Sequence, residues 1–415
     1  MARKMKDSGI EWIGKIPEGW EVVPVKRLCT MQAGKNLTSE QIAPEGTYPV
    51  YGGNGIRGFF SDYNCVGQFL TVGRQGALCG NVHKINGKVW ATEHAVITAP
   101  SSYAILDFLY YLLIGMDLNQ YVSSTAAQPG LAVGTLLNLK TCYPCSTLEQ
   151  TQISNYLNAK CSEIDTMLSR TRSSIEEYKK LKQAVITQAV TKGVRGEREM
   201  KNSKIEWVGN IPIDWNTIKL KYCTYIRARL GWKALKADEY VEIGFPFLSA
   251  FNIVNNTLQF TNLNYINQFR YDESPEIQLS NGDVLLVKDG AGIGKCAIVE
   301  NMPMPSTVNG SIAVVSVTNS LIPKYLYYYF LSKMFQQHID LLKDGMGVPH
   351  LFQSDLKEIK IAFPSKDEQK EIADYLDGKC AEIDKLIAKK EQLVKELENY
   401  KKSLIYEVVT GKREV

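Results

Sequence analysis

Apolar residues recur at heptad spacing in two long stretches of the chain, and this pattern predicts two long helices. The first stretch begins with Leu157 and Cys161, and the second repeats its phase 219 positions later, beginning with Leu376 and Cys380. Alternating intervals of three and four residues place such side chains along one face of a coiled-coil helix. A helix of about 45 residues, at 1.5 Å per residue, extends for roughly 65 Å. The matched apolar positions are Leu157, Cys161, Ile164, Leu168, Ile175, Tyr178, Val185 and Ala189, and Leu376, Cys380, Ile383, Ile387, Val394, Leu397, Leu404 and Val408.

Polar residues interrupt both stripes at the same places. Thr171 and Lys182 stand in the first stripe where Lys390 and Lys401 stand in the second. Because the stripes share length, phase and interruptions, we expect the two helices to form a coiled coil, most simply an antiparallel one. The pattern leaves three alternatives open: a parallel pair, a pairing between two chains, and ordinary bundle helices that pack on their own domains.

Two further pairs of segments indicate that the chain is an internal duplication. Asp7–Trp20 and Asn202–Trp215 are identical at eight of fourteen positions, and Ser146–Asp165 matches Ser365–Asp384 in the same order along the chain. Repeated segments in a repeated order predict repeated structure. Both members of the second pair begin Ser-x-x-Glu, the form of a capping box, in which serine and glutamate satisfy free amides at a helix start. We therefore expect each long helix to begin there.

The segments between the repeats have the pattern of a mixed α and β fold. Short apolar runs bounded by Gly-rich turns predict strands, and the aromatic-rich runs Leu106–Gly115 and Lys324–Met334 predict helices. We expect an α+β fold class with two similar α/β domains, residues 1–146 and 193–364, and two long helices, residues 147–192 and 365–411. The predicted strands are Leu70–Val72, Val89–Thr98, Asp283–Val287, Cys296–Val299 and Ile312–Val317.

Composition narrows the class of protein only slightly. The 415-residue chain has a formal net charge of +4, which permits a nucleic-acid partner without requiring one. Its apolar runs are far shorter than the roughly 20 residues that span a bilayer, and no apolar segment follows the basic N-terminus. Nine cysteines, an odd number without regular spacing, are typical of a reducing compartment. We therefore expect a cytoplasmic protein with no membrane partner.

The repeated motifs resemble those of type I restriction-modification specificity subunits. The family's entry motif, I-E-W-x-G-x-I-P-x-x-W, stands at Ile10–Trp20 and again at Ile205–Trp215. Its helix start, P-x-x-x-E-Q-x-x-I-x-x-Y-L, begins at Pro364 in the second half, whereas Cys145 replaces the proline in the first half. The resemblance covers the whole chain in the order domain, helix, domain, helix.

This resemblance implies a non-catalytic subunit that recognises double-stranded DNA. Each domain would be a target-recognition domain that reads one half of a bipartite, asymmetric site. The helices would set the spacing of the half-sites and dock two methyltransferase subunits, and restriction subunits with translocase and nuclease activity would join them. The chain itself would bind no cofactor: S-adenosylmethionine would belong to the methyltransferase, and ATP and Mg²⁺ to the restriction subunit. Two non-identical readers suit an asymmetric site, as a symmetric dimer suits a palindrome.

Gly-rich loops that carry cations or amides provide the candidate DNA contacts, because these groups bind phosphates and base edges. In the second domain, the basic segment Tyr225–Lys236 resembles the R-x-G-W-K segments of the family's recognition domains. A solvated basic face, with Trp232 packed inward, is the alternative for that segment. The candidate residues are Asn54, Arg57, Arg74, Gln75, Lys84, Arg227, Arg229, Trp232, Lys233, Arg270, Lys288 and Lys295.

The motifs that would indicate an enzyme fail on inspection. Gly290–Lys295 resembles a phosphate-binding loop, but Asp289 and Cys296 stand where that loop requires glycine and Ser or Thr, so a tight turn or a hairpin is expected. Cys142 and Cys145 resemble half a zinc site that has no second pair, so a buried strand end is expected there. We predict no catalytic residue and no metal site.

Two other functional classes remain to be separated from a DNA-reading subunit. A nuclease or methyltransferase would show activity as an isolated chain. A coiled-coil scaffold without a DNA role would bind DNA weakly or without dependence on salt, whereas phosphate contacts make affinity fall steeply as salt rises.

Overall fold

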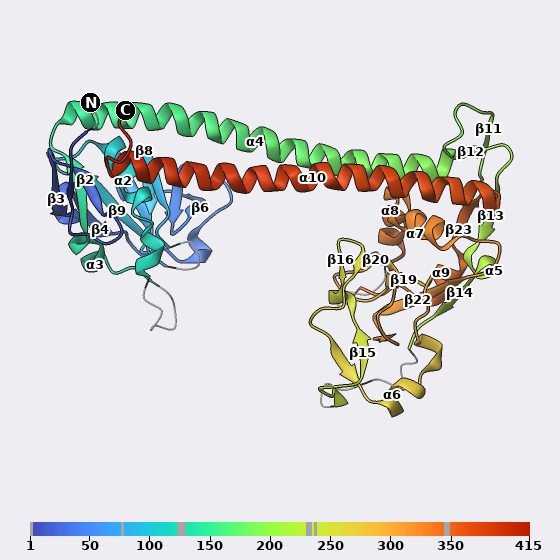
Figure 1. Cartoon of the computed structure of the whole chain (residues 1–415). Coiled ribbons are helices and arrows are strands. Elements are labelled where there is room, and N and C mark those ends of the chain that lie inside the picture. The colour runs from blue at the N-terminus through green and yellow to red at the C-terminus, as the bar shows by residue number, and fades with distance from the viewer. Residues whose placement is uncertain (1–2, 76–78, 123–129, 230–234, 236–238, 344–348) are drawn as a thin grey trace. The chain divides into compact units, whose positions relative to one another are not determined.

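The structure is a computed structural model, and it divides the chain into two compact units. Unit 1 comprises residues 1–172 and 391–415, and unit 2 comprises residues 173–390. Each unit joins a globular part to stretches of both long helices (Figure 1). The described residues are 3–75, 79–122, 130–229, 235, 239–343 and 349–415.

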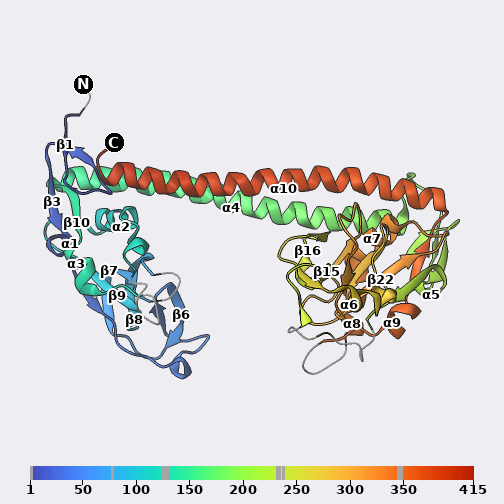
Figure 2. The same cartoon turned by 60° about the horizontal axis from the view of Figure 1, so that its bottom comes forward.

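Both predicted long helices are present and uninterrupted. Helix α4 spans Thr147–Lys192 and α10 spans Lys366–Val409. Figures 1 and 2 show them side by side. Within unit 1, Lys401 lies 2.7 Å from Asp165, and Glu398 pairs with Arg172. The partner on α10 changes from Lys401 to Glu398 as the residue on α4 advances from Asp165 to Arg172. The helices are therefore antiparallel, which confirms the predicted fold class.

The lysines that interrupt the apolar stripes form equivalent ion pairs in the two units. Lys401 of α10 pairs with Asp165 of α4 in unit 1, and Lys182 of α4 pairs with Asp384 of α10 in unit 2, at 2.6 Å. Lys182 corresponds to Lys401 and Asp165 to Asp384 under the offset of 219. Exposed ion pairs contribute at most about 1 kcal/mol each. Polar positions in a heptad stripe act mainly on register, because only one alignment gives both lysines a partner.

The same helices also belong to the core of each globular part. In unit 1, Leu157 and Leu168 of α4 and Leu404 of α10 are buried in one cluster with Phe108 and Leu112 of helix α2 (Leu106–Gly115). In unit 2, the corresponding cluster joins the end of α4 and the start of α10 to helix α7 (Pro323–Leu331). The coiled coil and the packing on each helix's own domain are therefore combined in one structure.

The start of each long helix departs from the predicted capping box. The serine half is present, since the Oγ atoms of Ser146 and Ser365 each accept from the amide three residues later at 3.4 Å. The glutamate half of the prediction is wrong. Glu149 accepts from the indole N–H of Trp20 at 3.0 Å, and Glu368 accepts from Trp215 at the same distance. Burial explains the difference, because a buried indole N–H requires an acceptor whereas a helix-end amide can find another one.

An arginine completes each of these carboxylate sites. Arg3 pairs with Glu149 and Arg198 pairs with Glu368, and each guanidinium also lies over the tryptophan ring, at 5.5 Å from Trp20 and 5.4 Å from Trp215. The repeated motifs that lie far apart in sequence therefore meet at the first turn of each long helix.

The glutamine that follows each glutamate is fully buried and fastens the aromatic helix. Gln150 Oε1 accepts from the amide of Ile105, just before α2, at 2.9 Å, and its Nε2 donates to the carbonyls of Tyr103 and Pro144. Gln369 does the same for α7: it accepts from Ile322 at 2.8 Å and donates to two carbonyls. The E-Q dipeptide thus connects the helix start to two parts of the globular fold.

Four antiparallel strands have the same order in both units. In unit 1 they are β4 (Cys29–Ala33), β9 (Ala95–Pro100), β7 (Cys65–Gly73) and β8 (Val82–Ala91). In unit 2 the order is β14 (Thr224–Arg227), β22 (Ile312–Val317), β19 (Val284–Val287) and β20 (Cys296–Ile298). Residue pairing places Gly73 and Val287 at equivalent positions, opposite Ala95 and Ile312 respectively. The two globular parts are diverged copies of one fold.

Each unit adds further elements around these strands. Unit 1 adds β1 (Met5–Asp7), β2 (Lys15–Pro17), β3 (Trp20–Pro24), α1 (Val25–Leu28), η1 (Ser39–Gln41), β5 (Tyr48–Gly52), β6 (Gly55–Phe60), η2 (Leu118–Tyr121), α3 (Val133–Asn138) and β10 (Lys140–Pro144). Unit 2 adds β11 (Met200–Asn202), β12 (Asn210–Pro212), β13 (Asn216–Lys219), α5 (Leu220–Cys223), β15 (Phe245–Leu248), η5 (Ala250–Asn252), β16 (Ile253–Val254), β17 (Thr257–Leu258), β18 (Asn264–Ile266), α6 (Gln268–Asp272), η6 (Pro275–Ile277), β21 (Thr307–Val308), α8 (Lys333–Leu342), α9 (Gln353–Glu358) and β23 (Lys360–Phe363).

Two predicted elements are corrected by the structure. The single strand expected over Val89–Thr98 is split, because β8 ends at Ala91 beside the parallel strand β5 and a turn then leads into β9. The helix expected over Lys324–Met334 ends at Leu331, since the Ser332 side chain accepts from the amide of Phe335 and so starts α8. Helix α2 has the predicted bounds, and Gly290–Lys295 lies in the turn of the β19–β20 hairpin, as expected.

The carboxylate at each helix start provides a test of this arrangement. Glu368 is 1% exposed in its side chain, whereas Glu149 is 28% exposed. We expect Glu368→Ala to lower the free energy of unfolding by about 3 kcal/mol, because it leaves Arg198 without its buried partner. The matched variant Glu149→Ala should lose only about 1 kcal/mol. Urea unfolding followed by tryptophan fluorescence measures both, and equal losses would contradict the role given to burial.

Candidate nucleic-acid interface

In unit 1, loops from four parts of the sequence converge at one end of the sheet. The amide of Asn81 donates to the side-chain oxygen of Asn54 at 2.6 Å, which joins the β7–β8 turn to the β5–β6 turn. The backbone amide of Arg74 donates to the carbonyl of His94 at 2.9 Å, and Gln75 forms a β-bridge with Gly130. We call these residues loop cluster 1. Sequence-predicted candidates from two separate Gly-rich segments therefore come together.

Unit 2 builds the same arrangement from different side chains. The amide of Lys288 donates to the carbonyl of Ser311, and the amide of Leu351 donates to the carbonyl of Lys288, both at 2.8 Å. Asp289 forms a β-bridge with His350. Lys288, Asp289 and His350 thus occupy the positions of Arg74, Gln75 and Gly130. We call these residues loop cluster 2.

Side-chain chemistry differs at these equivalent positions. In loop cluster 2, Lys288 lies 2.8 Å from Asp289, and the Asp289 carboxylate also contacts Nδ1 of His350. In loop cluster 1, Arg74 and Gln75 are half-buried. An amide and a guanidinium can pair with adenine and guanine edges, whereas a carboxylate accepts from the amino group of cytosine. The two clusters therefore place different side chains on one backbone frame, and in loop cluster 2 the Lys288 side chain is buried and paired with Asp289.

Three of the predicted contacts are exposed at or near these clusters. Asn54 lies in the β5–β6 turn, Arg57 follows on β6, and Lys295 ends the β19–β20 turn. Among the described residues, Arg57 and Lys295 form no ion pair. Their charges are available to a polyanion.

Lys84, in contrast, is occupied by its own domain. Its ammonium lies 2.8 Å from Asp107 and 4.5 Å from the centre of the Tyr110 ring. Burial raises the pKa of Asp107, but hydrogen bonds from Lys84 and Asn158 outweigh burial and leave that pKa below its ordinary value. Lys84 therefore fastens α2 to the sheet and to α4.

Unit 2 makes the equivalent attachment with the charges exchanged. Lys324, at the start of α7, pairs with Asp377 of α10 and lies 3.3 Å from Glu300. Tyr328 donates to Asp377 at 2.7 Å, just as Tyr111 donates to Asn158 at 2.8 Å in unit 1. The basic residue stands on the strand side in one unit and on the helix in the other.

The arginines of the basic segment Tyr225–Lys236, and Arg270 outside it, are also paired or buried within the protein. Arg227 donates to the buried carboxylate of Asp283 and to Ser316, and Arg270 pairs with Glu239 and Glu273. Arg229 is buried beside the Phe247 ring, and burial lowers the pKa of its guanidinium. The remaining candidates of this segment, Trp232 and Lys233, lie outside the described residues.

Sequence reasoning missed several polar residues of the loop clusters. Asn81 and His83 lie near the Asn54 turn, where a Cβ on Gly55 would stand 3.5 Å from the His83 ring. Burial lowers the pKa of His83. His350 of unit 2 was missed in the same way. A polar residue directly after a Gly-rich turn was the available signal, but it does not show which loops meet.

Among the described residues, no group of three His, Cys, Asp or Glu side chains could hold a metal ion. Cys142 is buried in β10 and Cys145 is exposed just beyond it, which matches the expected strand end. Within the same part of the chain, none of the helices is both long enough and apolar enough to cross a membrane.

The duplicated α+β units, the paired long helices and the two divergent loop clusters define a class of internally duplicated proteins with two similar domains. The chain belongs to the type I restriction-modification specificity family. The family's model, described as the type I restriction modification DNA specificity domain, matches residues 17–177 and 212–399. Members of this family are DNA-recognition subunits and not catalytic ones, as the resemblance implied.

Individual relatives agree with this assignment. The chain is 40% identical over 159 residues to the EcoprrI specificity subunit of Escherichia coli, a match that covers 37% of each chain. It is 26% identical over 416 residues to the MjaVIII specificity subunit of Methanocaldococcus jannaschii, covering 96% of this chain and 94% of the relative. A chain in a structure that describes assembly and conformational transition of the type I R-M system has the same fold, with a TM-score of 0.72, 15% identity and coverage of 96% and 99%.

The contrast between occupied and available cations gives a test. Asp283 is 4% exposed in its side chain, so we expect Arg227→Met to lower the free energy of unfolding by about 3 kcal/mol, because a buried carboxylate loses its partner. Lys295→Met should leave stability unchanged and weaken DNA binding. Thermal unfolding and DNA titration of both variants measure these effects. Loss of DNA affinity in a stable Arg227→Met protein would show that Arg227 contacts DNA instead.

Proposed function

We propose that each unit reads one half of a bipartite, asymmetric target in double-stranded DNA. On this proposal, residues 1–146 and 193–364 are the two target-recognition domains, and loop clusters 1 and 2 carry the side chains that contact bases. The observation that carries the proposal is one backbone frame with different groups at equivalent positions: Arg74 and Gln75 in unit 1, Lys288 and Asp289 in unit 2. A split site with unlike halves requires two such readers.

The long helices, residues 147–192 and 365–411, take two roles in this proposal. They set the number of base pairs between the half-sites, and they dock two methyltransferase subunits, to which restriction subunits are added. The specificity chain supplies no chemical step. S-adenosylmethionine belongs to the methyltransferase, and ATP and Mg²⁺ belong to the restriction subunit. These proteins act on DNA in the cytoplasm.

The proposal is tested by mapping adenine methylation in a host that lacks such methylation. The chain is expressed with the methyltransferase subunit encoded beside it, and single-molecule sequencing reads the modified bases. We expect a split motif that appears only when both proteins are present. A stable complex of the two proteins that leaves no motif would contradict the proposed function.

Exchange of one recognition domain gives a sharper prediction. We expect replacement of residues 21–145 by those of a relative to change one half of the methylated motif and to leave the other half and the spacing intact, because each loop cluster is built within its own unit. The reciprocal exchange of residues 216–363 is the matched control and should change only the other half. A simultaneous change in both halves would rule out independent readers.

A further inference from the structure

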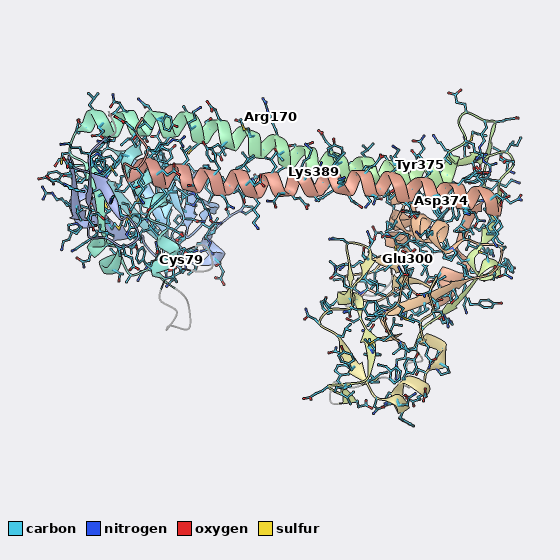
Figure 3. The ribbon with its side chains drawn as sticks, in the orientation of Figure 1. Cys79, Arg170, Glu300, Asp374, Tyr375 and Lys389 are labelled. Atoms are coloured by element: carbon cyan, nitrogen blue, oxygen red, sulfur yellow. The ribbon has the colours of Figure 1, made fainter. Side chains whose placement is uncertain are left out.

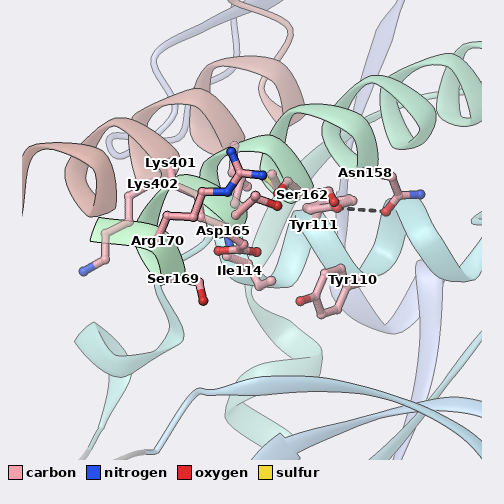
Figure 4. Close-up of a pocket in the computed structure, with 13 residues that line it drawn as sticks. Tyr110, Tyr111, Ile114, Asn158, Ser162, Asp165, Ser169, Arg170, Lys401 and Lys402 are labelled. Atoms are coloured by element: carbon pink, nitrogen blue, oxygen red, sulfur yellow. Dashed lines mark hydrogen bonds and ion pairs between the residues drawn. The ribbon is translucent and has the colours of Figure 1, made fainter. Parts of the chain in front are cut away.

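Two neighbouring hollows in unit 1 follow the long helices. One, of about 750 Å³, is lined by residues of α2, α4 and α10 (Figure 4). The other, of about 600 Å³, is lined by residues of α10, of the end of α2 and the segment after it, and of the β7–β8 turn and the start of β8. Both are lined by Ile114 and Lys402, so they form one surface, which we call groove 1.

Groove 1 carries cations that the protein does not neutralise. Lys401 pairs with Asp165 at 2.7 Å. Arg170 of α4 (Figure 3) and Lys402 of α10 are exposed and form no ion pair with any described residue. The exposed Asp117 is the other carboxylate of the lining among the described residues.

Neutral hydrogen-bond donors accompany these cations. Ser162 and Ser169 line the first hollow together with the hydroxyl-bearing Tyr110, whereas the hydroxyl of Tyr111 there already donates to Asn158 (Figure 4). Arginine, lysine, serine and tyrosine side chains are the groups that commonly bind phosphate oxygens in protein–DNA complexes. The lining therefore has the chemistry of a phosphate-binding surface.

Groove 1 is continuous with loop cluster 1. Asn81 and His83 line its second hollow, and the side chain of Asn81 is bonded to Asn54 in the β5–β6 turn. A duplex whose bases meet the loop cluster would have its backbone next to this groove.

Unit 2 has a hollow of about 950 Å³ at the corresponding place, which we call groove 2. Gln183, Ala184 and Thr187 of its lining correspond to Lys402, Ser403 and Tyr406 of groove 1 under the offset of 219. Its positive charge does not come from the positions that carry charge in groove 1. Lys179 is paired with Glu176 at 2.8 Å, so other lysines must supply the excess charge. The further cations of groove 2 are Lys180, Lys192 and Lys333.

We propose that grooves 1 and 2 bind backbone phosphates of the DNA that flanks each half-site, so that the long helices contact DNA without reading its sequence. This inference rests on the proposed function. Different residues supply the same sign of charge in the two grooves, as expected for a contact that requires charge but no fixed geometry. Such contacts hold a duplex in register while base contacts distinguish sequences.

The first experiment measures the salt dependence of DNA binding by the full chain, using a duplex of random sequence. Log affinity falls as log salt rises, and each lost phosphate contact makes this slope shallower by about 1. We therefore expect the double variant Arg170→Gln/Lys402→Gln to bind more weakly and to lose about 2 from that slope. Lys15→Gln, which removes an exposed cation of unit 1 outside the groove, is the matched control and should change the slope less. Equal slopes in the double variant and the control would overturn the proposal.

A second variant should act in the opposite direction. Asp117 has φ 44°, in the left-handed region, and its side chain does not cap η2. Asparagine adopts this conformation readily, so Asp117→Asn should keep the fold while removing a negative charge from the groove. We expect tighter binding to the same duplex, and weaker or unchanged binding would count against the proposal.

Two further readouts separate this proposal from its alternatives. When a groove variant is combined with the methyltransferase, the complex should still methylate the same motif as the complex of the unaltered chain. A changed motif would mean that these residues read bases, and loss of the methyltransferase complex would mean that the groove docks that protein; either result overturns the proposal. If the unaltered chain in complex with the methyltransferase bound DNA with an affinity independent of salt, the proposed function itself would be overturned. This result differs from a failure of the groove proposal alone, in which the unaltered complex still binds DNA in a salt-dependent way.

Discussion

The fold depends on a hydrogen-bonded carboxylate and a buried carboxamide in the first turn of each long helix. Glu368 receives the indole N–H of Trp215 and the guanidinium of Arg198, and the neighbouring Gln369 binds three backbone groups. Glu149 and Gln150 form the same set of contacts in unit 1. Buried polar groups that lose their partners destabilise a protein by several kcal/mol when charged. Two adjacent side chains therefore fix the entry segment, the aromatic helix and the long helix together.

This constraint explains which parts of the two halves remained alike. The entry motif and the helix start supply each other's hydrogen-bond partners, so neither can change alone. At the positions of Arg74 and Lys288 the loop clusters are held by backbone hydrogen bonds, and these bonds do not depend on the side chain. A frame that fixes the backbone but leaves the side chain free permits two readers with unlike chemistry.

The regular part of the fold could be predicted from sequence because it rests on local or repeated patterns. The heptad stripes predicted α4 and α10, and the aromatic run Leu106–Gly115 predicted α2 at its observed bounds. The end of α7 could not be predicted in this way, because the Ser332 side chain starts a second helix where the apolar pattern continues. The predicted capping role of Glu149 was also wrong. A capping box joins residues three apart, whereas the contact of Glu149 with Trp20 joins residues 129 apart.

The candidate contacts show a second limit of sequence reasoning. Lys84, Arg227 and Arg270 belong to basic or Gly-rich segments, yet each has an acidic partner remote in sequence. Whether a cation is available to DNA depends on tertiary pairing. The exchanged charges of Lys84–Asp107 and Glu300–Lys324 show that a domain can place such a pair in either polarity.

The unpaired cations of unit 1 do not all lie in the basic or Gly-rich segments of the sequence. In unit 1, the cations that remain without an ion pair among the described residues include Arg57 beside the loop cluster and Arg170 and Lys402 on the long helices. Charges on the helices are fixed relative to the sheet, because α2, α4 and α10 share one core. A loop can therefore vary its base contacts while the helices continue to hold the phosphates, which separates affinity from specificity on one scaffold.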